Sequence, residues 1–491
     1  MANFMTRAWA LRWIKRLSLV ALVAFVCVVG VRIFDAQRKP PLSVWHTYVP
    51  QEMHAHEIDQ ATWADYIAHE NRLFDAVREN VTDKLPQEER VPANRYFSGS
   101  PIYPGHFRTD WNRSFTLVPQ GAPRGVAVML HGLTDSPYSL RHIAQRYQRD
   151  GFVVVAIRLP GHGTVPSSLT DVTAEDWEAA TRLAVREARR RVPASVPLHI
   201  VGYSNGGALA LEYTLEALQD PSLPKPDRLV LLSPMIGITQ FARFAGVAGL
   251  PAILPPFAKA AWLDIVPEFN PFKYNSFPVN GARQSWRLTQ TIQQEVAQAA
   301  RGALLASLPP VLTFQSVLDF TVSTRALISS LYAQLPDNGS ELVLFDINRT
   351  AQWSPLLRAS MRDALSRLVP VPPLRYRLTV LTNGSANSPE VVEQNTAPEA
   401  TAATVESTGL DYPADVYSLS HVALPFPVTD SLYGRTPDPN DDDLGIHLGA
   451  QSIRGETGAL IVGSGALTRL LWNPFYPYIA TRIDQLTAAP P

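Results

Sequence analysis

Ser204 lies in a five-residue pattern that is typical of a nucleophile. Residues 202–206 read Gly-Tyr-Ser-Asn-Gly; they follow a short apolar run at 198–203 and precede a stretch at 207–218 that is rich in Ala, Leu and Glu. A strand, a sharp turn and a helix in this order form a nucleophile elbow, in which the helix N-terminus presents N–H groups to a developing oxyanion. A glycine-rich turn that merely contains a serine fits these five residues equally well.

Only two of the eleven histidines, His421 and His447, follow Ser204 in the chain. A nucleophile on such an elbow takes its base from a histidine that comes later in the sequence. His421 follows an extended, β-prone run at 416–420, which would hold its imidazole beside a sheet and partly shielded from water. His447 comes shortly after three aspartates, whose charges favour the protonated imidazole that cannot act as a base. We therefore expect His421 to be the base.

Asp319 is the candidate for the acid that orients this imidazole. It ends a predicted strand that begins at residue 311, and active-site residues of an open α/β sheet lie at the carboxyl ends of its strands. Asp346 also ends a predicted strand and is the rival for this role. The alternative for Asp319 is a structural one, in which it caps the helix that follows it.

The elements that would position these residues form an α/β pattern. Short apolar runs alternate with helical stretches from about residue 116, which predicts a mostly parallel sheet with helices on both faces. The rhythm breaks at 234–305, where an apolar, proline-rich stretch predicts an inserted cap, and at 384–409, where the composition predicts a mobile loop. The strands are expected at 125–130, 152–157, 198–203, 228–232, 311–316, 341–346 and 376–381.

Four stretches of the sequence resemble the α/β-hydrolase superfamily, and within it the monoacylglycerol lipase-like and lysophospholipase-like serine hydrolases. They are Leu-His-Gly-Leu at 130–133, Arg-Leu-Pro-Gly-His-Gly at 158–163, Gly-Tyr-Ser-Asn-Gly-Gly at 202–207 and Asp-Phe-Thr-Val at 319–322. The resemblance extends over roughly residues 120–425. It implies Ser204 as nucleophile, Asp319 as acid and a late histidine as base, with the backbone N–H groups of Leu133 and Asn205 as the oxyanion hole.

The chain departs from the family pattern at one place. The family's histidine usually follows soon after the strand that comes next after the acid, but here the strand at 341–346 continues into Asn348-Arg349-Thr350 without a histidine. Some seventy residues intervene before His421, so the resemblance supports the histidine less firmly than the serine or the aspartate.

The N-terminal residues predict a membrane anchor. Residues 17–31 carry no charge, four basic residues precede them and Arg32 follows. Basic residues before an apolar run keep the N-terminus in the cytoplasm and place the body outside it, in the periplasm or the extracellular space. A cleaved signal peptide, which would release a secreted protein, is the alternative. The expected organisation is a cytoplasmic basic segment (1–16), a signal anchor or transmembrane helix (17–34), an N-terminal extension (35–115) and an α/β-hydrolase domain (116–485) with a cap at about 234–305.

Composition narrows the class of function. The net charge of −1 argues against electrostatic binding of nucleic acid. The single cysteine, Cys27, excludes an intramolecular disulfide. The resemblance implies a serine hydrolase that cleaves lipid or short acyl esters of carboxylic acids and needs no metal or organic cofactor. Hydrolysis of peptide amides or thioesters by the same mechanism, and an inactive hydrolase fold used as a binding module, are the alternatives.

Overall fold

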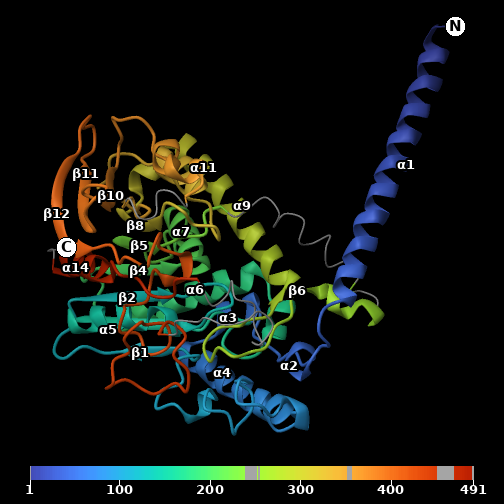
Figure 1. Cartoon of the computed structure of the whole chain (residues 1–491), viewed down its shortest axis with the longest axis horizontal. Helices are drawn as coiled ribbons and strands as arrows, with labels where there is room; N and C mark the ends of the chain where they lie inside the picture. The colour runs from blue at the N-terminus through green and yellow to red at the C-terminus, as the bar shows by residue number, and fades with distance from the viewer. Residues whose placement is uncertain (1, 238–251, 253–254, 351–356, 451–468, 489–491) are drawn as a thin grey trace.

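A ten-stranded sheet runs through the part of the chain that the computed structural model describes, which is residues 2–237, 252, 255–350, 357–450 and 469–488 (Figure 1). The strands lie in the order β1-β3-β2-β4-β5-β8-β9-β10-β11-β12. Their bounds are β1 (Phe115–Leu117), β2 (Gly125–Leu130), β3 (Phe152–Ile157), β4 (Leu198–Tyr203), β5 (Arg228–Leu232), β8 (Val311–Ser316), β9 (Glu341–Phe345), β10 (Arg377–Asn383), β11 (Glu390–Thr396) and β12 (Thr404–Asp411).

The middle of the sheet is parallel. The neighbouring strands from β3 through β10 pair in parallel, whereas β1, β11 and β12 run antiparallel to their neighbours. Parallel strands are buried on both faces and therefore read as continuous apolar runs in the sequence. For this reason the expected strands coincide with β2, β3, β4, β5 and β8 and differ by one or two residues from β9 and β10. The predicted α/β class with a mostly parallel sheet is confirmed.

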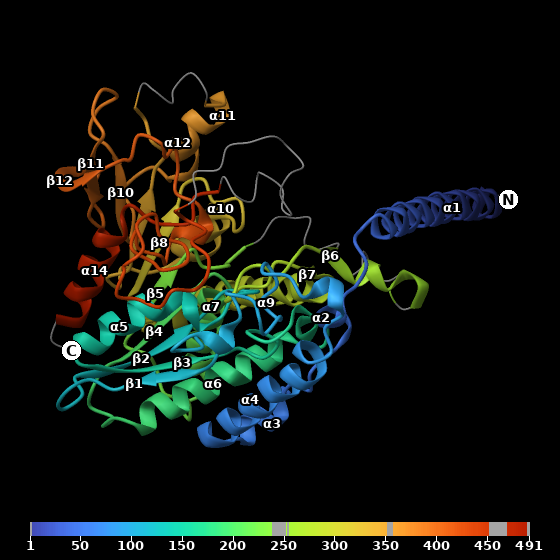
Figure 2. The ribbon, with the colours of Figure 1, turned by 60° about the horizontal axis from the view of Figure 1, so that its bottom comes forward.

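Helices cover both faces of the sheet (Figure 2). On β2, Val126 and Val128 face a core that they share with α6 (Ala174–Arg190), α7 (Asn205–Gln219) and α9 (Val279–Arg301). Ala127 and Met129 face the opposite core, which contains side chains of α5 (Arg141–Arg149) and α14 (Tyr476–Ala488). The two-residue repeat of a strand thus divides one apolar run between two cores.

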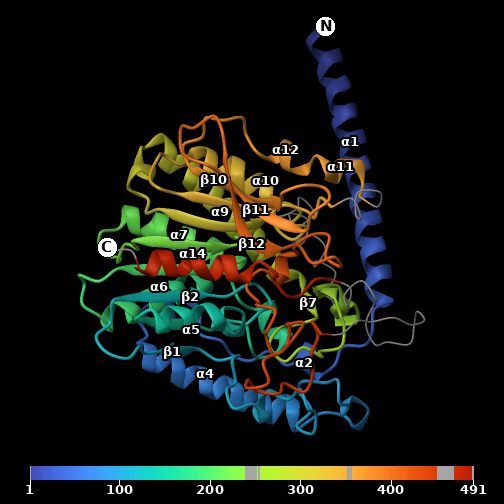
Figure 3. The same ribbon diagram turned by 60° about the vertical axis from the view of Figure 1, so that its left-hand side comes forward.

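Two antiparallel strands extend the sheet where the sequence predicts a mobile loop. Residues 384–409 contain β11 and most of β12, and β11 lies beside β10 with β12 beyond it (Figure 3). The register pairs Leu378 with Thr396, and Val391 with Leu410. The prediction of a loop at 384–409 is therefore wrong. The sequence does not reveal β12 as a strand because β12 is exposed on most of its length and lacks the apolar alternation that marks a strand.

The N-terminal helix α1 (Ala2–Gln37) projects from the body of the molecule (Figure 1). It includes residues 17–34, for which the sequence predicts a membrane-spanning helix. Among the helical residues that the structure describes, however, none forms a stretch long and apolar enough to cross a bilayer. The structure therefore supports a helix at this place but does not support its membrane-spanning character.

Residues 35–115 pack against the domain that follows them. They contain α2 (Val44–Thr47), α3 (Ala55–Gln60) and α4 (Trp63–Val77), of which α3 and α4 lie beside α6 (Figure 2). The buried guanidinium of Arg158, just after β3, contacts both oxygens of Glu52 at 2.9 and 3.0 Å and Glu70 Oε2 at 3.2 Å. We call these three side chains the Arg158 clamp. A bidentate arginine–carboxylate pair is among the stronger polar contacts in proteins, so the clamp joins the extension to the sheet.

The segment for which the sequence predicts a cap lies between β5 and β8. Its described part comprises the short strands β6 (Trp262–Asp264) and β7 (Phe277–Pro278) and then helix α9, while the predicted cap residues 238–251 and 253–254 lie outside the described residues. The backbone N–H of Tyr274 donates to Thr134 O at 2.8 Å, which attaches the cap to the loop after β2. Three short helices follow the cap in the chain: α10 (Thr324–Ala326), α11 (Ala359–Arg362) and α12 (Ala364–Leu368).

Candidate active site

Ser204 occupies the sharp turn between β4 and α7. Its φ of 54° is unusual for a residue with a side chain, so the surrounding structure must hold the turn in place. Glycines make this possible: a Cβ on Gly206 would lie 1.9 Å from Leu130 O, and one on Gly202 would lie 2.4 Å from Gly206 O. The predicted strand, turn and helix around Ser204 are therefore present, and the close approach of their backbones requires both glycines.

Three predicted site residues meet at this turn. His421 Nε2 lies 3.0 Å from Ser204 Oγ, and His421 Nδ1 lies 2.8 Å from Asp319 Oδ2. Both distances are ordinary hydrogen-bond lengths, so the three side chains form a continuous line. Ser204 is buried, and the side chains of His421 and Asp319 are 4% and 0% exposed.

Asp319 is held by several donors besides His421. Its Oδ1 accepts from the backbone N–H groups of Thr321 at 2.8 Å and Val322 at 3.0 Å, and its Oδ2 accepts from Gln315 Nε2 at 3.1 Å. Burial raises the pKa of this carboxyl, but the attraction and hydrogen bond of His421 and the two backbone donors outweigh burial and leave the pKa below its ordinary value. Asp319 is therefore ionised in the range where an imidazole titrates.

The rival residues lie elsewhere. Asp346 pairs with Arg349 and accepts a hydrogen bond from Thr382 Oγ1 at 3.0 Å. The ring of His447 contacts the backbone oxygen of Ser431 at 2.9 Å through Nδ1, and its side chain is half-exposed. Of the candidate acids and bases named from the sequence, His421 is thus the base that contacts Ser204, and Asp319 is the acid that contacts His421.

Asn348 explains how His421 reaches the site from so far along the chain. It follows β9, at the place where the family pattern would carry its histidine. Its backbone N–H donates to Tyr417 O, and its Nδ2 donates to Val416 O, both at 2.8 Å. In addition, Ser316 Oγ at the end of β8 donates to Leu419 O at 2.7 Å. These bonds attach the segment before His421 to the ends of β8 and β9, so the inserted strands β10 to β12 do not displace the imidazole.

Leu133 and Asn205, the two predicted oxyanion donors, both belong to segments beside Ser204. Leu133 lines the pocket that contains Ser204, and Asn205 follows Ser204 at the first position of α7. Among the described residues, neither backbone N–H donates a hydrogen bond. The amide side chain of Asn205 is also fully buried and has no hydrogen-bond partner within the described chain. The two predicted oxyanion donors are therefore free to bind a ligand oxygen.

The pocket in front of Ser204 has a volume of about 350 Å³. Leu133, Met235, Phe277 and Val322 form an apolar part of its wall. The wall also carries three charged side chains that the sequence analysis did not identify: Asp135, Lys273 and Arg469. Asp135 follows the motif at 130–133 and could have been noticed by its place, whereas no local signal connects Lys273 or Arg469 with Ser204.

The two histidines of the family motifs are structural in their surroundings. His131 Nε2 accepts from the backbone N–H of Leu159 at 3.0 Å, and His162 Nδ1 contacts Pro160 O at 3.0 Å. Burial lowers the pKa of His162 to about 4 and that of His131 well below its ordinary value, so both are neutral at physiological pH. They shape the loop after β3. In the part of the chain that the structure describes, no group of His, Cys, Asp and Glu could hold a metal ion.

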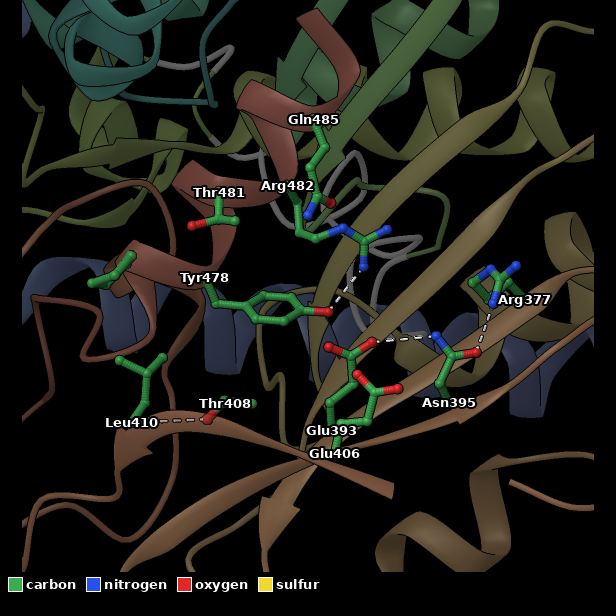
Figure 4. A pocket seen from close by; sticks show the side chains of 11 residues that line it. Arg377, Glu393, Asn395, Glu406, Thr408, Leu410, Tyr478, Thr481, Arg482 and Gln485 are labelled. Carbon is green, nitrogen blue, oxygen red and sulfur yellow. Dashed lines mark hydrogen bonds between the residues drawn. The ribbon is translucent and has the colours of Figure 1, made fainter. Parts of the chain in front are cut away.

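A second hollow of about 600 Å³ lies between α14 and the strands β10 to β12 (Figure 4). Three of its charged side chains form hydrogen bonds with neutral neighbours that line the same hollow. Arg482 Nη1 donates to the Tyr478 hydroxyl at 2.9 Å, Arg377 Nη1 donates to Asn395 Oδ1 at 2.8 Å, and Asn395 Nδ2 donates to Glu393 Oε1 at 3.2 Å. None of the residues that line this hollow lines the pocket of Ser204.

Comparisons with known proteins agree with this geometry. Residues 121–346 match the family model described as serine aminopeptidase, S33. The chain is 33% identical over 92 residues to a thermostable monoacylglycerol lipase of Bacillus sp. (strain H-257), which is 19% of this chain and 35% of that protein. It is 29% identical over 101 residues to a monoacylglycerol lipase of Mycolicibacterium smegmatis, which is 20% of this chain and 34% of that protein. The matches span about a third of the length of these relatives.

Solved structures are also similar to this chain. A monoacylglycerol lipase of Paleococcus ferrophilus aligns at a TM-score of 0.35 and 18% identity, over 52% of this chain and 98% of that one. A metagenome-derived lipolytic enzyme aligns at a TM-score of 0.37 and 22% identity, over 48% of this chain and 88% of that one. The parallel sheet and the elbow thus occur together with a match to a hydrolase family model over residues 121–346 and a local similarity to monoacylglycerol lipases.

Proposed function

We propose that the protein is a serine hydrolase that cleaves carboxylic esters. The observation that carries this proposal is the hydrogen-bonded line from Ser204 through His421 to the ionised Asp319, at a strained turn beside a pocket. A serine hydroxyl is a weak nucleophile until an adjacent base accepts its proton, and a third group must hold that base in the correct tautomer.

In the proposed reaction, Asp319 accepts the Nδ1–H of His421, which leaves Nε2 free to accept the Ser204 proton. Ser204 Oγ forms a bond to the acyl carbon, and the N–H groups of Leu133 and Asn205 bind the resulting oxyanion. The imidazolium then protonates the alcohol oxygen as the carbon–oxygen bond breaks. Water, deprotonated by the same imidazole, attacks the acyl-enzyme and releases the carboxylic acid. The loss of one oxyanion donor typically lowers the rate by ~10²–10³.

Lipid or short acyl esters are the proposed substrates. The apolar part of the pocket wall suits an acyl chain, and the two curated relatives are named as monoacylglycerol lipases. Peptide amides are the second candidate class because the description of the matched family is serine aminopeptidase. Thioesters require the same reacting groups and form the third class.

A substrate panel tests these proposals. We expect purified protein to hydrolyse p-nitrophenyl esters of graded chain length faster than an aminoacyl p-nitroanilide or an acyl thioester, and to react with a fluorophosphonate probe. Ser204→Ala should remove both activities while leaving the circular dichroism spectrum unchanged, because the substitution creates no large cavity. Wild-type turnover by folded Ser204→Ala would contradict the mechanism, and a wild-type protein that neither reacts with the probe nor hydrolyses esters would favour a binding module.

We also propose that α1 attaches the protein to a membrane and that the hydrolase domain lies outside the cytoplasm. The support is the uncharged run at 17–31 with basic residues before it, together with the exposure of its side chains. Leu19, Val20, Val26, Val31 and Phe34 are each more than half exposed, which is costly in water and favourable in lipid.

Fractionation tests the attachment. A helix that spans the bilayer resists extraction by carbonate and by high salt, whereas a peripheral protein is released. We expect the full chain to remain in the membrane fraction, and a variant that starts at residue 38 to be soluble and still active on esters. Release of the full chain by carbonate would exclude a spanning anchor, and a mature N-terminus beyond residue 31 would indicate a cleaved signal peptide instead.

A further inference from the structure

Two cations in the pocket of Ser204 have no role in the hydrolytic steps described above. Lys273 comes from the cap, and Arg469 comes from the C-terminal part of the chain. Burial lowers the pKa of Lys273 most, the charge of Asp135 raises it, and Arg469 is close enough that its charge lowers it. Two like charges repel, and in this pocket the single carboxyl of Asp135 offsets one of the two.

The neighbours of Lys273 hold it rigidly at the pocket wall. On one side, the ring of Phe272 stacks on the ring of Tyr138 with centroids 4.1 Å apart. On the other side, the backbone of Tyr274 is bonded to Thr134 O, and the Tyr274 hydroxyl donates to Gly161 O at 3.1 Å. The backbone of Lys273 is therefore fixed before any ligand arrives, which reduces the entropy lost when its side chain binds one.

The ammonium of Lys273 has no hydrogen-bond acceptor among the described residues. This differs from the hollow beside α14, where the arginines bind neighbouring side chains (Figure 4). The carboxyl of Asp135, which lines the same pocket, attracts the Lys273 charge but does not bind it directly. An ammonium can donate three hydrogen bonds, so Lys273 retains its full capacity for a ligand.

Within the described part of the chain, one hydrogen bond places Arg469 at the same pocket. Its Nη2 donates to Thr321 Oγ1 at 3.0 Å, and the backbone N–H of Thr321 donates to Asp319 Oδ1. The remaining N–H groups of this exposed guanidinium make no hydrogen bond within the described chain. The pocket thus presents one lysine and one arginine with unused donors, against one carboxyl, Asp135.

We propose that Lys273 and Arg469 bind an anionic oxygen group, a phosphate or a carboxylate, on the ester substrate and so select anionic esters over neutral ones. The inference rests on the proposed ester hydrolysis by Ser204 and adds to it the charge of the preferred substrate. Asp135 opposes this selection because its negative charge faces the same pocket. Burial raises the pKa of Asp135 to about 6 against the effect of Lys273, so the carboxyl is mostly ionised at pH 8.

Matched esters test the proposal. The neutral substrate is a monoacylglycerol, and the two anionic substrates carry the same acyl chain with a phosphate or a succinate on the glycerol. We expect kcat/KM at pH 8 to be about tenfold or more higher for at least one anionic ester, because a hydrogen bond to a charged group corresponds to about 10- to 100-fold. This ratio should fall as sodium chloride rises from about 0.02 M to about 0.5 M. The anionic ester with the higher kcat/KM relative to the neutral ester shows whether the site prefers a phosphate or a carboxylate.

Variants assign the selection to the two cations. Lys273→Met and Arg469→Met should each lower kcat/KM for the preferred anionic ester by about tenfold and leave that for the neutral ester within about twofold. Lys273→Arg should retain most of the preference. Asp135→Asn should raise it, because the substitution removes the opposing charge. Lys225→Met is the matched control, since Lys225 is an exposed lysine outside the pocket and should change neither value.

Turnover of the neutral ester distinguishes a failure of the proposed anion site from a failure of the proposed hydrolase function. A wild-type enzyme that hydrolyses neutral and anionic esters equally, with no effect of salt, overturns the anion site while the proposed hydrolase function stands. Equal losses on both esters in folded Lys273→Met also overturn it, because they indicate a structural role. If Lys273→Met does not fold, the salt dependence of the wild type and the effect of Asp135→Asn decide. Absence of turnover on all three esters contradicts the proposed function itself.

Discussion

At the scale of single residues, the candidate site depends on three side chains that differ in how they are held. Ser204 is fixed by the strained backbone of its turn, and Asp319 by four hydrogen-bond donors. His421 is fixed by the segment before it, through Asn348 and Ser316. Of these three side chains, the imidazole of His421 is thus the one whose position depends on contacts between residues that lie far apart in the sequence.

We expect His421→Ala to lower kcat on esters by about a thousandfold or more, as the loss of a triad member does. His447→Ala is the control, and its turnover should stay within about tenfold of the wild type because His447 contacts a backbone oxygen away from Ser204. Initial rates on a p-nitrophenyl ester measure both variants. The reverse order of the two losses would place the base at residue 447.

Sequence and structure agree on these residues for reasons that are local. The glycines and apolar runs around Ser204 determine a turn within a few residues, and Asp319 was identified by its place after a strand. Lys273 and Arg469 could not be identified in this way, because the cap and the C-terminal segment reach the pocket only through tertiary contacts such as the bond from Tyr274 to Thr134.

At the scale of elements, three helices meet through a group of carboxyls. Glu178 of α6, Glu212 and Glu216 of α7, and Glu295 of α9 interact electrostatically, and we call them the carboxyl cluster. Burial, followed by the charge of Glu175, raises the pKa of Glu178 to about 7. Burial and the charges of the cluster raise the pKa of Glu212 well above its ordinary value of 4.5, and one of its oxygens has no hydrogen-bond partner within the described chain.

The raised pKa values predict a stability that decreases as pH rises. Between the ordinary pKa of 4.5 and the higher folded value, the folded state binds more protons than the unfolded state, so the free energy of unfolding falls with increasing pH. We expect Glu212→Gln to have a free energy of unfolding about 1–3 kcal/mol higher than that of the wild type at pH 8, and therefore to unfold at a higher urea concentration. At pH 4.5 the two proteins should differ little. Urea titrations at both values measure this, and equal stability at pH 8 would contradict it.

Some strands of the sheet could be predicted from the sequence and others could not. The parallel strands β2, β3 and β4 are buried on both faces and were predicted at their observed bounds. The antiparallel strands β11 and β12 were predicted as a loop, because most of their side chains are polar, β12 is largely exposed, and the pairing of β11 with β10 and of β12 with β11 is a property of the folded sheet.

At the scale of the whole molecule, the Arg158 clamp connects residues that are about a hundred positions apart. Arg158 follows β3, whereas Glu52 and Glu70 lie in the N-terminal extension. All three are buried, so the two carboxylates would remain in the interior without a counterion if the guanidinium were removed.

We expect Arg158→Met to lower the free energy of unfolding by about 3–5 kcal/mol, because it leaves buried charges unpaired. The triple variant Arg158→Met, Glu52→Gln, Glu70→Gln should recover part of this loss, since the charges are then absent. Urea unfolding monitored by tryptophan fluorescence provides the values. A loss below about 1 kcal/mol in the single variant would mean that the clamp does not stabilise the fold.

The long stretch of sequence between Ser204 and His421 also means that the ribosome makes the two residues at different times. The two residues are 217 positions apart, and β10 to β12 are added to the sheet between them. A ribosome that adds about 5–20 residues per second needs about 10–40 s to extend the chain from one to the other. Throughout that time the nascent chain contains its elbow serine without the imidazole that would activate it. If the proposed mechanism holds, hydrolytic competence is gained only after residue 421 has been made, and a product that is terminated before His421 lacks the proposed base.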